Sequence, residues 1–393
     1  MAAAPADDVM RTVDGTPLRV SLARAMRRRR MMALALVLPL FLFILFSFVL
    51  PIADMLFRSV ENPQVMEIMP NTTAALKDWN GDALPDEEVF AALAGDLKTG
   101  AESREIGKVA TRLNYEISGS RGLIMKSARR ARNLEPPYKE ALIAIDKDWG
   151  DLSVWKLIKR ESSPYTASYY LAAIDMRTED DGEIVSQPPD QRIYVTLFLR
   201  TLWISLLITG LTLLLGFPVA YLLATLPLKY SNLLMIMVLL PFWTSLLVRT
   251  TAWIAMLQQK GVLNDLLVWA NIISDDNRLA LMYNQLGTTV AMTHILLPFM
   301  VLPLYSVMRT ISPSYMRAAQ SLGAPRFLAF WRVYAPLTLP GVGAGAILVF
   351  ILAIGYYITP ALVGGTSGQL ISNFIAYHMQ SSLNWGLAAA LGS

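Results

Sequence analysis

Long stretches without any charged residue constrain this chain more than any other feature. Residues 31–53, 201–228, 231–248 and 279–308 contain no Asp, Glu, Lys or Arg, and neither does the segment 333–393. A helix needs about 20 apolar residues to cross the hydrocarbon core of a bilayer. Backbone polar groups in that core must be satisfied within the segment, and an α-helix does this. The sequence therefore predicts an all-α polytopic membrane protein with about six transmembrane helices.

The placement of basic residues predicts which side of the membrane each segment faces. Hydrophobic residues make up 54% of the chain and charged residues 16%, so the net charge of +4 is no sign of nucleic-acid binding. On one side Lys260 and Arg278 are offset by three aspartates, whereas the other side carries an excess of basic residues. The positive-inside rule places the N-terminus and that basic side in the cytoplasm. The basic side holds Arg24, Arg27, Arg28, Arg29, Arg30, Lys229, Arg309, Arg317, Arg326 and Arg332.

The first apolar run is predicted to be a retained helix rather than a cleaved signal peptide. A signal peptide has an apolar core of about 7–15 residues followed by a small-residue cleavage site. The run 31–53 is longer and has no clear site of that kind. The chain contains no cysteine, which excludes disulfides and Cys-ligated metals.

The sequence predicts four regions: a cytoplasmic basic tail (1–30), transmembrane helix 1 (31–53), an extracytoplasmic insertion (54–192) and a membrane core (193–393). The insertion follows a helix that starts in the cytoplasm, so it is expected on the outside. Its 139 residues suffice for a small core of their own, and apolar residues at helical spacing predict a mostly helical fold. It has no histidine, and no metal-ligand or nucleophile–base cluster is predicted there.

Further transmembrane helices are predicted within the core. A short amphipathic helix is expected at 262–270, outside the membrane. A sixth span begins near Leu383 but reaches only about 18 Å before the last residue, short of a core of roughly 30 Å. We therefore expect either a truncated sequence or an incomplete last helix. The other spans are expected at about 196–224, 231–256, 285–309 and 338–360.

A polar and basic island at 312–341 separates two of these apolar runs. Ser312 is a good N-cap, and Pro313 suits the first helical position. Gly323 supplies a left-handed stop for this first short helix. Ala318 and Ala319 would let another protein surface approach closely. An island of this kind exceeds what a connection needs, so we expect it to contact something outside the membrane.

A second short helix is predicted to start at Pro325, and Pro336 and Pro340 are expected to return the chain to the membrane. Its aromatic residues recur at helical spacing, which predicts a single apolar face. These residues are Phe327, Phe330, Trp331 and Tyr334.

The island resembles the cytoplasmic coupling loop of permease subunits from binding-protein-dependent ABC importers. That motif has an acidic residue, two alanines, three free positions, a glycine, nine free positions, an aliphatic residue, one free position, a leucine and a proline. Arg317 replaces the acidic residue and Ala335 replaces the leucine, while the matching positions are Ala318, Ala319, Gly323, Val333 and Pro336. The resemblance implies a coupling loop at 311–337. Its contact residues would be Arg317, Ala318, Ala319, Leu322, Gly323, Ala324, Phe330, Val333 and Pro336.

The resemblance implies a transport subunit of the bacterial inner membrane rather than an enzyme. Its partners would be the lipid bilayer, a second permease subunit, a cytoplasmic ABC ATPase dimer and an extracytoplasmic solute-binding protein; no nucleic acid is expected. The chain has no Gly-x-x-x-x-Gly-Lys phosphate loop, so ATP would be bound by the partner subunit and no cofactor by this chain. The alternative is an amphipathic interfacial loop without a partner.

Two further stretches resemble the spermidine/putrescine branch of this family. Residues 241–245 read Pro-Phe-Trp-Thr-Ser and precede Arg249, and residues 355–360 read Gly-Tyr-Tyr-Ile-Thr-Pro. The resemblance implies a polyamine as cargo. An opine, an amino-acid derivative and iron stay alternatives, because permeases for other solutes share these motifs.

A translocation path is expected along Trp243, Arg249, Tyr356 and Tyr357, whose rings could face a cation. Each residue also has an ordinary explanation. Aromatic residues are common at membrane interfaces, and an arginine near the outer surface can reach water. His294 is expected to make a packing hydrogen bond rather than to relay protons.

Other classes of protein fit the sequence less well. A membrane receptor would have a cytoplasmic signalling domain, whereas this chain returns to the membrane repeatedly. A secondary transporter would need internal repeats and buried acidic residues for ion coupling, and neither is visible. An intramembrane enzyme would need a catalytic cluster within the spans.

Overall fold

The computed structural model describes residues 18–393, so residues 1–17 of the predicted tail 1–30 lie outside the described residues. The chain divides into two compact units, Met1–Arg58 and Ser59–Ser393. The first contains α1 (Leu18–Ile44), a π-helical turn η1 (Leu45–Val49) and α2 (Leu50–Arg58). Proline has no backbone N–H to donate to a carbonyl of the preceding turn. The helix widens into the π-helical turn η1 just before Pro51. Residues Ala25–Arg58 are long and apolar enough to cross a membrane.

Residues 54–58 of the predicted insertion belong to α2, and the name insertion is kept below for residues 59–192. This segment is mostly helical and has a hydrophobic core of its own. Phe90, Trp149 and Trp155 are fully buried in this core. The rings of Phe90 and Trp155 meet edge to face with centroids 4.6 Å apart. A two-stranded antiparallel hairpin pairs β1 with β2. The elements are α3 (Gln64–Ile68), α4 (Pro70–Ala75), α5 (Glu87–Glu102), α6 (Ile106–Glu116), α7 (Ser120–Arg130), η2 (Ala131–Asn133), α8 (Tyr138–Ile145), η3 (Lys147–Gly150), α9 (Leu152–Glu161), α10 (Ser168–Ala173), β1 (Met176–Thr178) and β2 (Ile184–Ser186).

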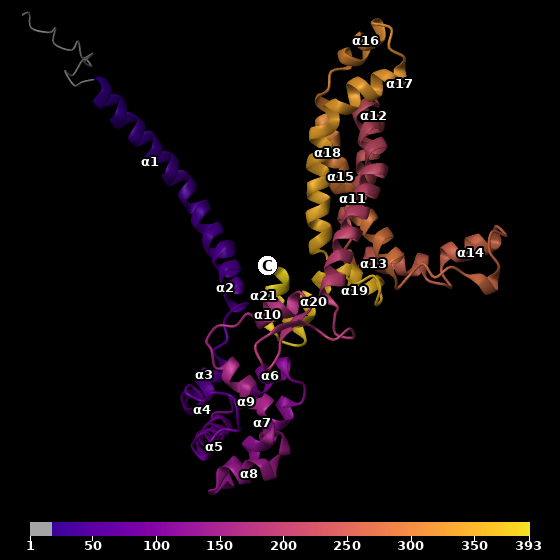
Figure 1. Ribbon diagram of the computed structural model, residues 1–393. Coiled ribbons are helices and arrows are strands. Elements are labelled where there is room, and N and C mark those ends of the chain that lie inside the picture. Colours follow the sequence, from indigo (N-terminus) through magenta and orange to yellow (C-terminus); the bar gives the residue numbers. More distant parts are fainter. Residues whose placement is uncertain (1–17) are drawn as a thin grey trace, which may run out of the picture. The chain divides into compact units, whose positions relative to one another are not determined.

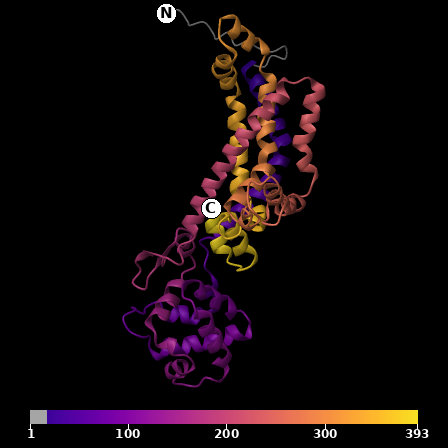
Figure 2. The ribbon, with the colours of Figure 1, turned by 90° about the vertical axis from the view of Figure 1, so that its right-hand side faces the viewer.

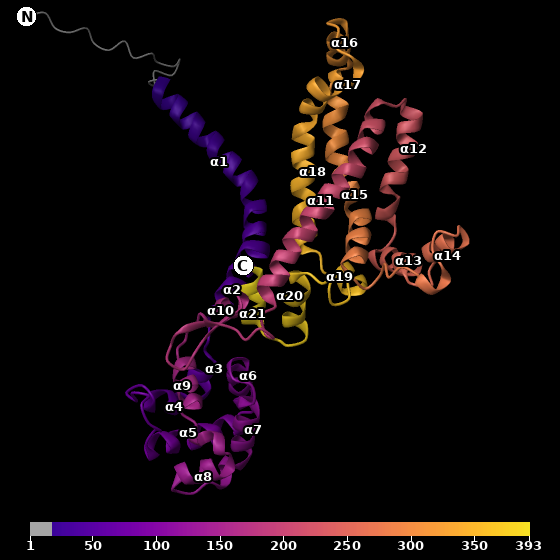
Figure 3. The same ribbon diagram turned by 45° about the vertical axis from the view of Figure 1, so that its right-hand side comes forward.

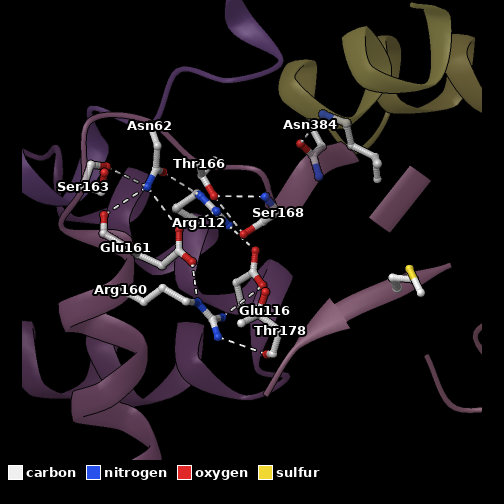
Figure 4. Close-up of polar contacts among 12 residues, drawn as sticks. Asn62, Arg112, Glu116, Arg160, Glu161, Ser163, Thr166, Ser168, Thr178 and Asn384 are labelled. Atoms are coloured by element: carbon white, nitrogen blue, oxygen red, sulfur yellow. Dashed lines mark hydrogen bonds and ion pairs between the residues drawn. The ribbon is translucent and has the colours of Figure 1, made fainter. Parts of the chain in front are cut away.

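A buried network of charges joins α6 and α9 of the insertion (Figure 4). The guanidinium of Arg112 donates to Asn62 Oδ1 at 2.7 Å, to Glu116 Oε1 at 2.8 Å and to Glu161 Oε2 at 2.5 Å. Arg160 donates to the remaining oxygens of both glutamates, at 3.1 and 3.2 Å. Burial opposes the charge on Arg112, but the neighbouring tyrosine and glutamate groups outweigh burial and raise its pKa. Each buried charge in the network is therefore stabilised by the opposite charges and hydrogen bonds of its neighbours.

Replacing Glu161 with alanine should strongly destabilise the insertion. The Arg112 side chain is only 2% exposed, so the variant leaves a buried positive charge short of a partner. We expect a loss of about 3–5 kcal/mol in the free energy of unfolding, as measured for other broken buried pairs. Denaturant unfolding of the full chain, followed by the fluorescence of the buried tryptophans, measures this. The control is Glu105→Ala, which removes an exposed ion pair to Lys108 and should leave the transition unchanged.

Three long helices of the second unit lie side by side: α11 (Tyr194–Thr225), α15 (Gln285–Thr310) and α18 (Ala335–Gly355) (Figures 1 and 2). Small residues set their spacing. A Cβ on Gly216 of α11 would lie 3.2 Å from Met300 Cγ, and one on Gly345 of α18 would lie 2.7 Å from Met300 Sδ. A Cβ on Gly341 would come within 3.0 Å of Val307. Glycines therefore let α11 and α18 approach α15 closely, as in other membrane bundles.

After β2 the described part of the chain contains helices and no further β-strand. The predicted outer helix at 262–270 is present as α14. The described residues contain four helices that could cross a membrane, or five if the bent pair α12–α14 counts as one span. The remaining elements are α12 (Leu228–Leu239), η4 (Leu240–Trp243), α13 (Leu246–Leu257), α14 (Val262–Trp269), η5 (Asp275–Asn277), α16 (Pro313–Ser321), α17 (Arg326–Ala329), η6 (Phe330–Tyr334), α19 (Ile358–Val363), α20 (Ile371–Gln380) and α21 (Trp385–Gly392).

The segment predicted as a span at 231–256 is bent in the structure. The chain bends by 99° between Leu228–Trp243 and Leu246–Trp269, as Figure 3 shows between α12 and α13. Thr244 is extended, and the side chain of Ser245 accepts a hydrogen bond from Val248 N to begin α13. This N-cap starts a new helix where the apolar run continued without any charge. Hydropathy alone did not reveal the break.

The boundaries of the predicted fifth span at 338–360 also differ. Arg326–Gly355 is one continuous helical segment of α17, η6 and α18, although Pro336 and Pro340 lie within it. The π-helical turn η6 precedes Pro336, so the helix widens where the proline cannot donate a hydrogen bond. The helix ends at Gly355, and α19 follows after a short break. The second short helix of the island is thus continuous with the span.

The insertion is bonded directly to the start of α11. The Asp175 carboxylate is buried and accepts three backbone hydrogen bonds, from Ile193 N at 3.1 Å and from Tyr194 N and Val195 N at 2.9 Å each. These N–H groups have no partner inside the helix, and the helix dipole favours a negative charge there. A second contact packs Tyr169 of α10 against α21, where a Cβ on Gly386 would lie 2.4 Å from the ring.

We expect Asp175→Ala to lower the stability of the second unit by about 1–2 kcal/mol, the range for loss of a strong N-cap. Asp175→Asn keeps one acceptor oxygen and should lose less. The thermal unfolding midpoint of the purified chain in detergent measures both. An equal loss in the two variants would show that the hydrogen bonds to α11 are not what Asp175 contributes.

Candidate coupling loop and translocation site

The first helix of the coupling loop, α16, has capping interactions at both ends. The Ser312 hydroxyl accepts a hydrogen bond from Ser314 N at 3.3 Å. At the other end Gly323 adopts a left-handed φ of +90°. Ala324 N donates to Ala319 O at 3.1 Å and Gly323 N donates to Gln320 O at 2.9 Å, which together form a Schellman motif. The positive φ is the reason that a glycine is needed here. Lack of space is not, because no atom outside the adjacent residues lies within 4 Å of where a Cβ would be.

The predicted contact residues of the loop differ in exposure. Leu322 is 89% exposed at the tip between α16 and α17. Arg317, Ala318 and Gly323 are also exposed, whereas Ala319 and Ala324 are half-buried. Farther along the chain, Val333 is half-buried and Pro336 is exposed. The tip therefore presents a large apolar side chain on a rigid turn beside two small residues.

The aromatic residues of the loop contact one another, as expected from their spacing, but they differ in burial. Phe330 and Tyr334 stack with centroids 5.6 Å apart and pack edge to face against Tyr221 of α11. Phe327 and Trp331 point away from the bundle and are 76% and 58% exposed. A π-helical turn contains more residues than an α-helical turn. Side chains spaced for 3.6 residues per turn therefore no longer point in the same direction across η6. One pair anchors the loop, and the other pair is exposed for contact.

The basic residues of the loop have no acidic partner within the described part of the chain. Arg309, Arg317, Arg326 and Arg332 form no ion pair there. The sequence contains no Asp or Glu after Asp276. The exposed surface of the loop therefore combines apolar side chains with uncompensated positive charge.

Of the predicted path residues, Arg249 lies on α13, and Tyr356 and Tyr357 directly follow α18. Trp243 lies at the end of η4 and is 76% exposed, and Tyr357 is half exposed beside Tyr356. Among the described residues, no side-chain hydrogen bond or ring contact joins Trp243 or Tyr357 to Arg249. No such contact joins Tyr356 to Arg249 either, so the grouping of the four residues along one path stays a prediction.

Sequence reasoning missed the side-chain contacts that join α13 to its neighbouring helices. Trp253 donates its indole N–H to His294 Nδ1 at 3.2 Å, and this bond joins α13 to α15. Thr250 and Thr359 approach each other at 3.5 Å between their hydroxyl oxygens, which joins α13 to α19. Trp253 lies four residues after Arg249, so helical spacing could have indicated that the two share a face. The partners on α15 and α19 could not be found without the fold.

Stability measurements should separate the two kinds of aromatic residue in the loop. Phe330→Ala removes a ring packed against α11 and should cost about 2–4 kcal/mol, near the lower end of aromatic truncations because the ring is partly exposed. The same change at Phe327 should stay within about 0.5 kcal/mol, because its ring is largely in solvent. Thermal unfolding of the two variants in detergent makes the comparison. Equal losses would contradict the division of the aromatic residues into anchoring and exposed pairs.

The helical bundle defines the class of protein: a helical subunit of a membrane, with several helices apolar and long enough to span it. Residues 213–392 match the family described as binding-protein-dependent transport system inner membrane component. The spermidine/putrescine transport system permease protein PotB of Escherichia coli strain K12 is 36% identical over 198 residues, covering 50% of this chain and 71% of that protein. The PotB protein of Haemophilus influenzae is 34% identical over 227 residues, covering 56% and 79%.

The chain belongs to this family of ABC importer permeases, and it is a transport subunit rather than the ATPase. The crystal structure of a bacterial ABC transporter that imports alginate is 21% identical, with a TM-score of 0.38, and the match covers 51% of this chain and 75% of that one. The insertion lies outside the residues that match the family. The predicted membership and the all-α polytopic class are confirmed.

Proposed function

We propose that this chain translocates a polyamine such as spermidine or putrescine across the bacterial inner membrane. The similarity to PotB proteins over half of the chain carries this proposal. An extracytoplasmic binding protein would deliver the cargo, and a second permease subunit would complete the path. The half-buried Tyr356 and the exposed Trp243 and Tyr357 offer ring faces that attract a cation.

In this proposal the coupling loop docks into a cytoplasmic ATPase dimer, which binds and hydrolyses the ATP. The exposed Leu322 and Phe327 would occupy an apolar groove on that partner. The loop is continuous with α18 through α17 and η6, so a displacement of the loop moves a membrane helix. Alternating access would follow from closure of the ATPase dimer.

The orientation of the chain in the membrane is part of the same proposal. The basic loop and the tail 1–30 would face the cytoplasm, and the insertion would face outward as a docking surface for the binding protein. The predicted domain boundaries and the six-span arrangement are part of this proposal. Energised uptake by this chain alone, in liposomes without any ATPase, would contradict it.

Gly323→Val should abolish both ATPase association and uptake. Valine is β-branched and strongly disfavours a φ of +90°, so the turn after α16 would have to rearrange. Gly343→Val is the matched control, because Gly343 also has open space around it but lies inside α18 without a positive φ. Co-purification of the importer's own ATPase and uptake of radiolabelled spermidine by the co-expressed complex measure the effect. Normal association and uptake in the Gly323 variant would rule out this loop as the coupling element.

A further inference from the structure

A cavity of about 370 Å³ lies where the insertion meets α21. Its wall comes from α6, α10 and β1 of the insertion, from the segment after β2, and from α21. Figure 4 shows one residue from each of the four named elements: Glu116, Ser168, Thr178 and Asn384. The volume falls within the range of small-molecule sites in proteins. The cavity is therefore large enough to hold a ligand of its own.

The charged side chains of the wall, Glu116 and Arg177, are both already paired. Glu116 Oε1 accepts from Arg112 at 2.8 Å, and Glu116 Oε2 accepts from Arg160 at 3.2 Å. Arg177 pairs with Glu179 at 3.2 Å. A charged ligand would have to leave water for this cavity without a free counter-charge, which is costly. The cavity therefore favours a neutral molecule.

Two nearly buried side chains of the wall have polar groups without a partner in the described chain. Tyr169 is 7% exposed, and its hydroxyl makes no hydrogen bond with any described residue. Asn384 is 6% exposed; its Oδ1 accepts from Leu387 N at 3.2 Å, but its amide nitrogen donates to no described residue. Burial raises the pKa of Tyr169, so the hydroxyl keeps its proton. Buried polar groups are costly to leave unsatisfied, so both have hydrogen-bonding capacity for a ligand.

The fold holds both side chains in fixed positions. The ring of Tyr169 packs so closely on Gly386 of α21 that no Cβ would fit there. The side chain of Asn384 caps the start of α21. Just before this cap, the Tyr115 hydroxyl of the insertion donates to Ser382 O at 3.2 Å. Polar groups from the insertion and from α21 thus surround one cavity, and contacts between these two parts keep them there.

We propose that this cavity binds a neutral polyol, a small molecule with several hydroxyl groups. A hydroxyl both donates and accepts, so neighbouring hydroxyls of one ligand can satisfy the Tyr169 O–H and the Asn384 amide. The amide side chains of Asn114, Gln187 and Gln191 add donors and acceptors to the wall. The ligand would bridge the insertion and α21. The insertion lies outside the residues that match the permease family, so this site is separate from the proposed transport function.

Saturation-transfer NMR on the purified full chain tests the proposal, in a detergent without a sugar headgroup. The probes are glucose and myo-inositol as neutral polyols, with putrescine as a cation and succinate as an anion for comparison. Titration of each probe gives its dissociation constant. We expect at least one of the polyols to bind and neither charged probe to do so, because the cavity offers hydrogen bonds without a free charge.

Two conservative variants locate the binding. Tyr169→Phe removes the hydroxyl and keeps the ring, and Asn384→Asp keeps the oxygen that caps α21 but removes the amide donor. Each should weaken polyol binding about tenfold, the effect of losing one hydrogen bond to a buried group. Tyr138→Phe and Asn133→Asp make the same changes in the insertion outside the cavity and should leave binding unchanged. Should one cavity variant fail to fold, the other carries the test.

Three results would overturn the proposal. The first is that neither polyol binds the native chain. The second is that putrescine or succinate binds as tightly as the polyols, which contradicts a neutral site. The third is polyol binding that survives both cavity variants, which places the ligand elsewhere on the chain. Transport is not measured, so each of these results leaves the proposed polyamine cargo untouched.

Discussion

The close approach of α11 and α18 to α15 is the interaction on which the membrane part of this protein depends. Apolar side chains gain little by leaving lipid for a helix interface, so packing contacts have to hold the helices together. Gly216, Gly341 and Gly345 remove the side chains that would separate these helices, and Met300 occupies the space on α15. The same arrangement positions Tyr221 of α11 against the base of the coupling loop. A loop anchored in this way can pass a displacement to the bundle.

The continuity of α17, η6 and α18 gives the loop its mechanical connection. A flexible joint at Pro336 would absorb movement of the loop, whereas a continuous helix transmits it. The π-helical turn accommodates the proline without breaking the helix. At the tip, the Schellman turn at Gly323 holds Leu322 in solvent. The loop is therefore rigid where it would meet a partner and packed where it meets the membrane helices.

The insertion is connected to the membrane core by more than its covalent links. Asp175 caps α11, and Tyr169 packs on α21. The face of Tyr169 also lies 4.8 Å from the guanidinium carbon of Arg112, inside the buried network of the insertion. A continuous set of contacts thus runs from the core of the insertion to a helix at the start of the bundle and one at its end.

The sequence by itself determined the all-helical membrane class, most of the helices, the caps of α16 and the coupling-loop motif, because each depends on local spacing, hydropathy or backbone angle. It also grouped Arg249 and Tyr356 with Trp243 and Tyr357, and that grouping stays a prediction. Only the tertiary structure decided the 99° bend after Trp243, the division of the loop aromatics, and the hydrogen bond between Trp253 and His294. Those features depend on contacts between segments far apart in the chain, and local pattern carries no information about them.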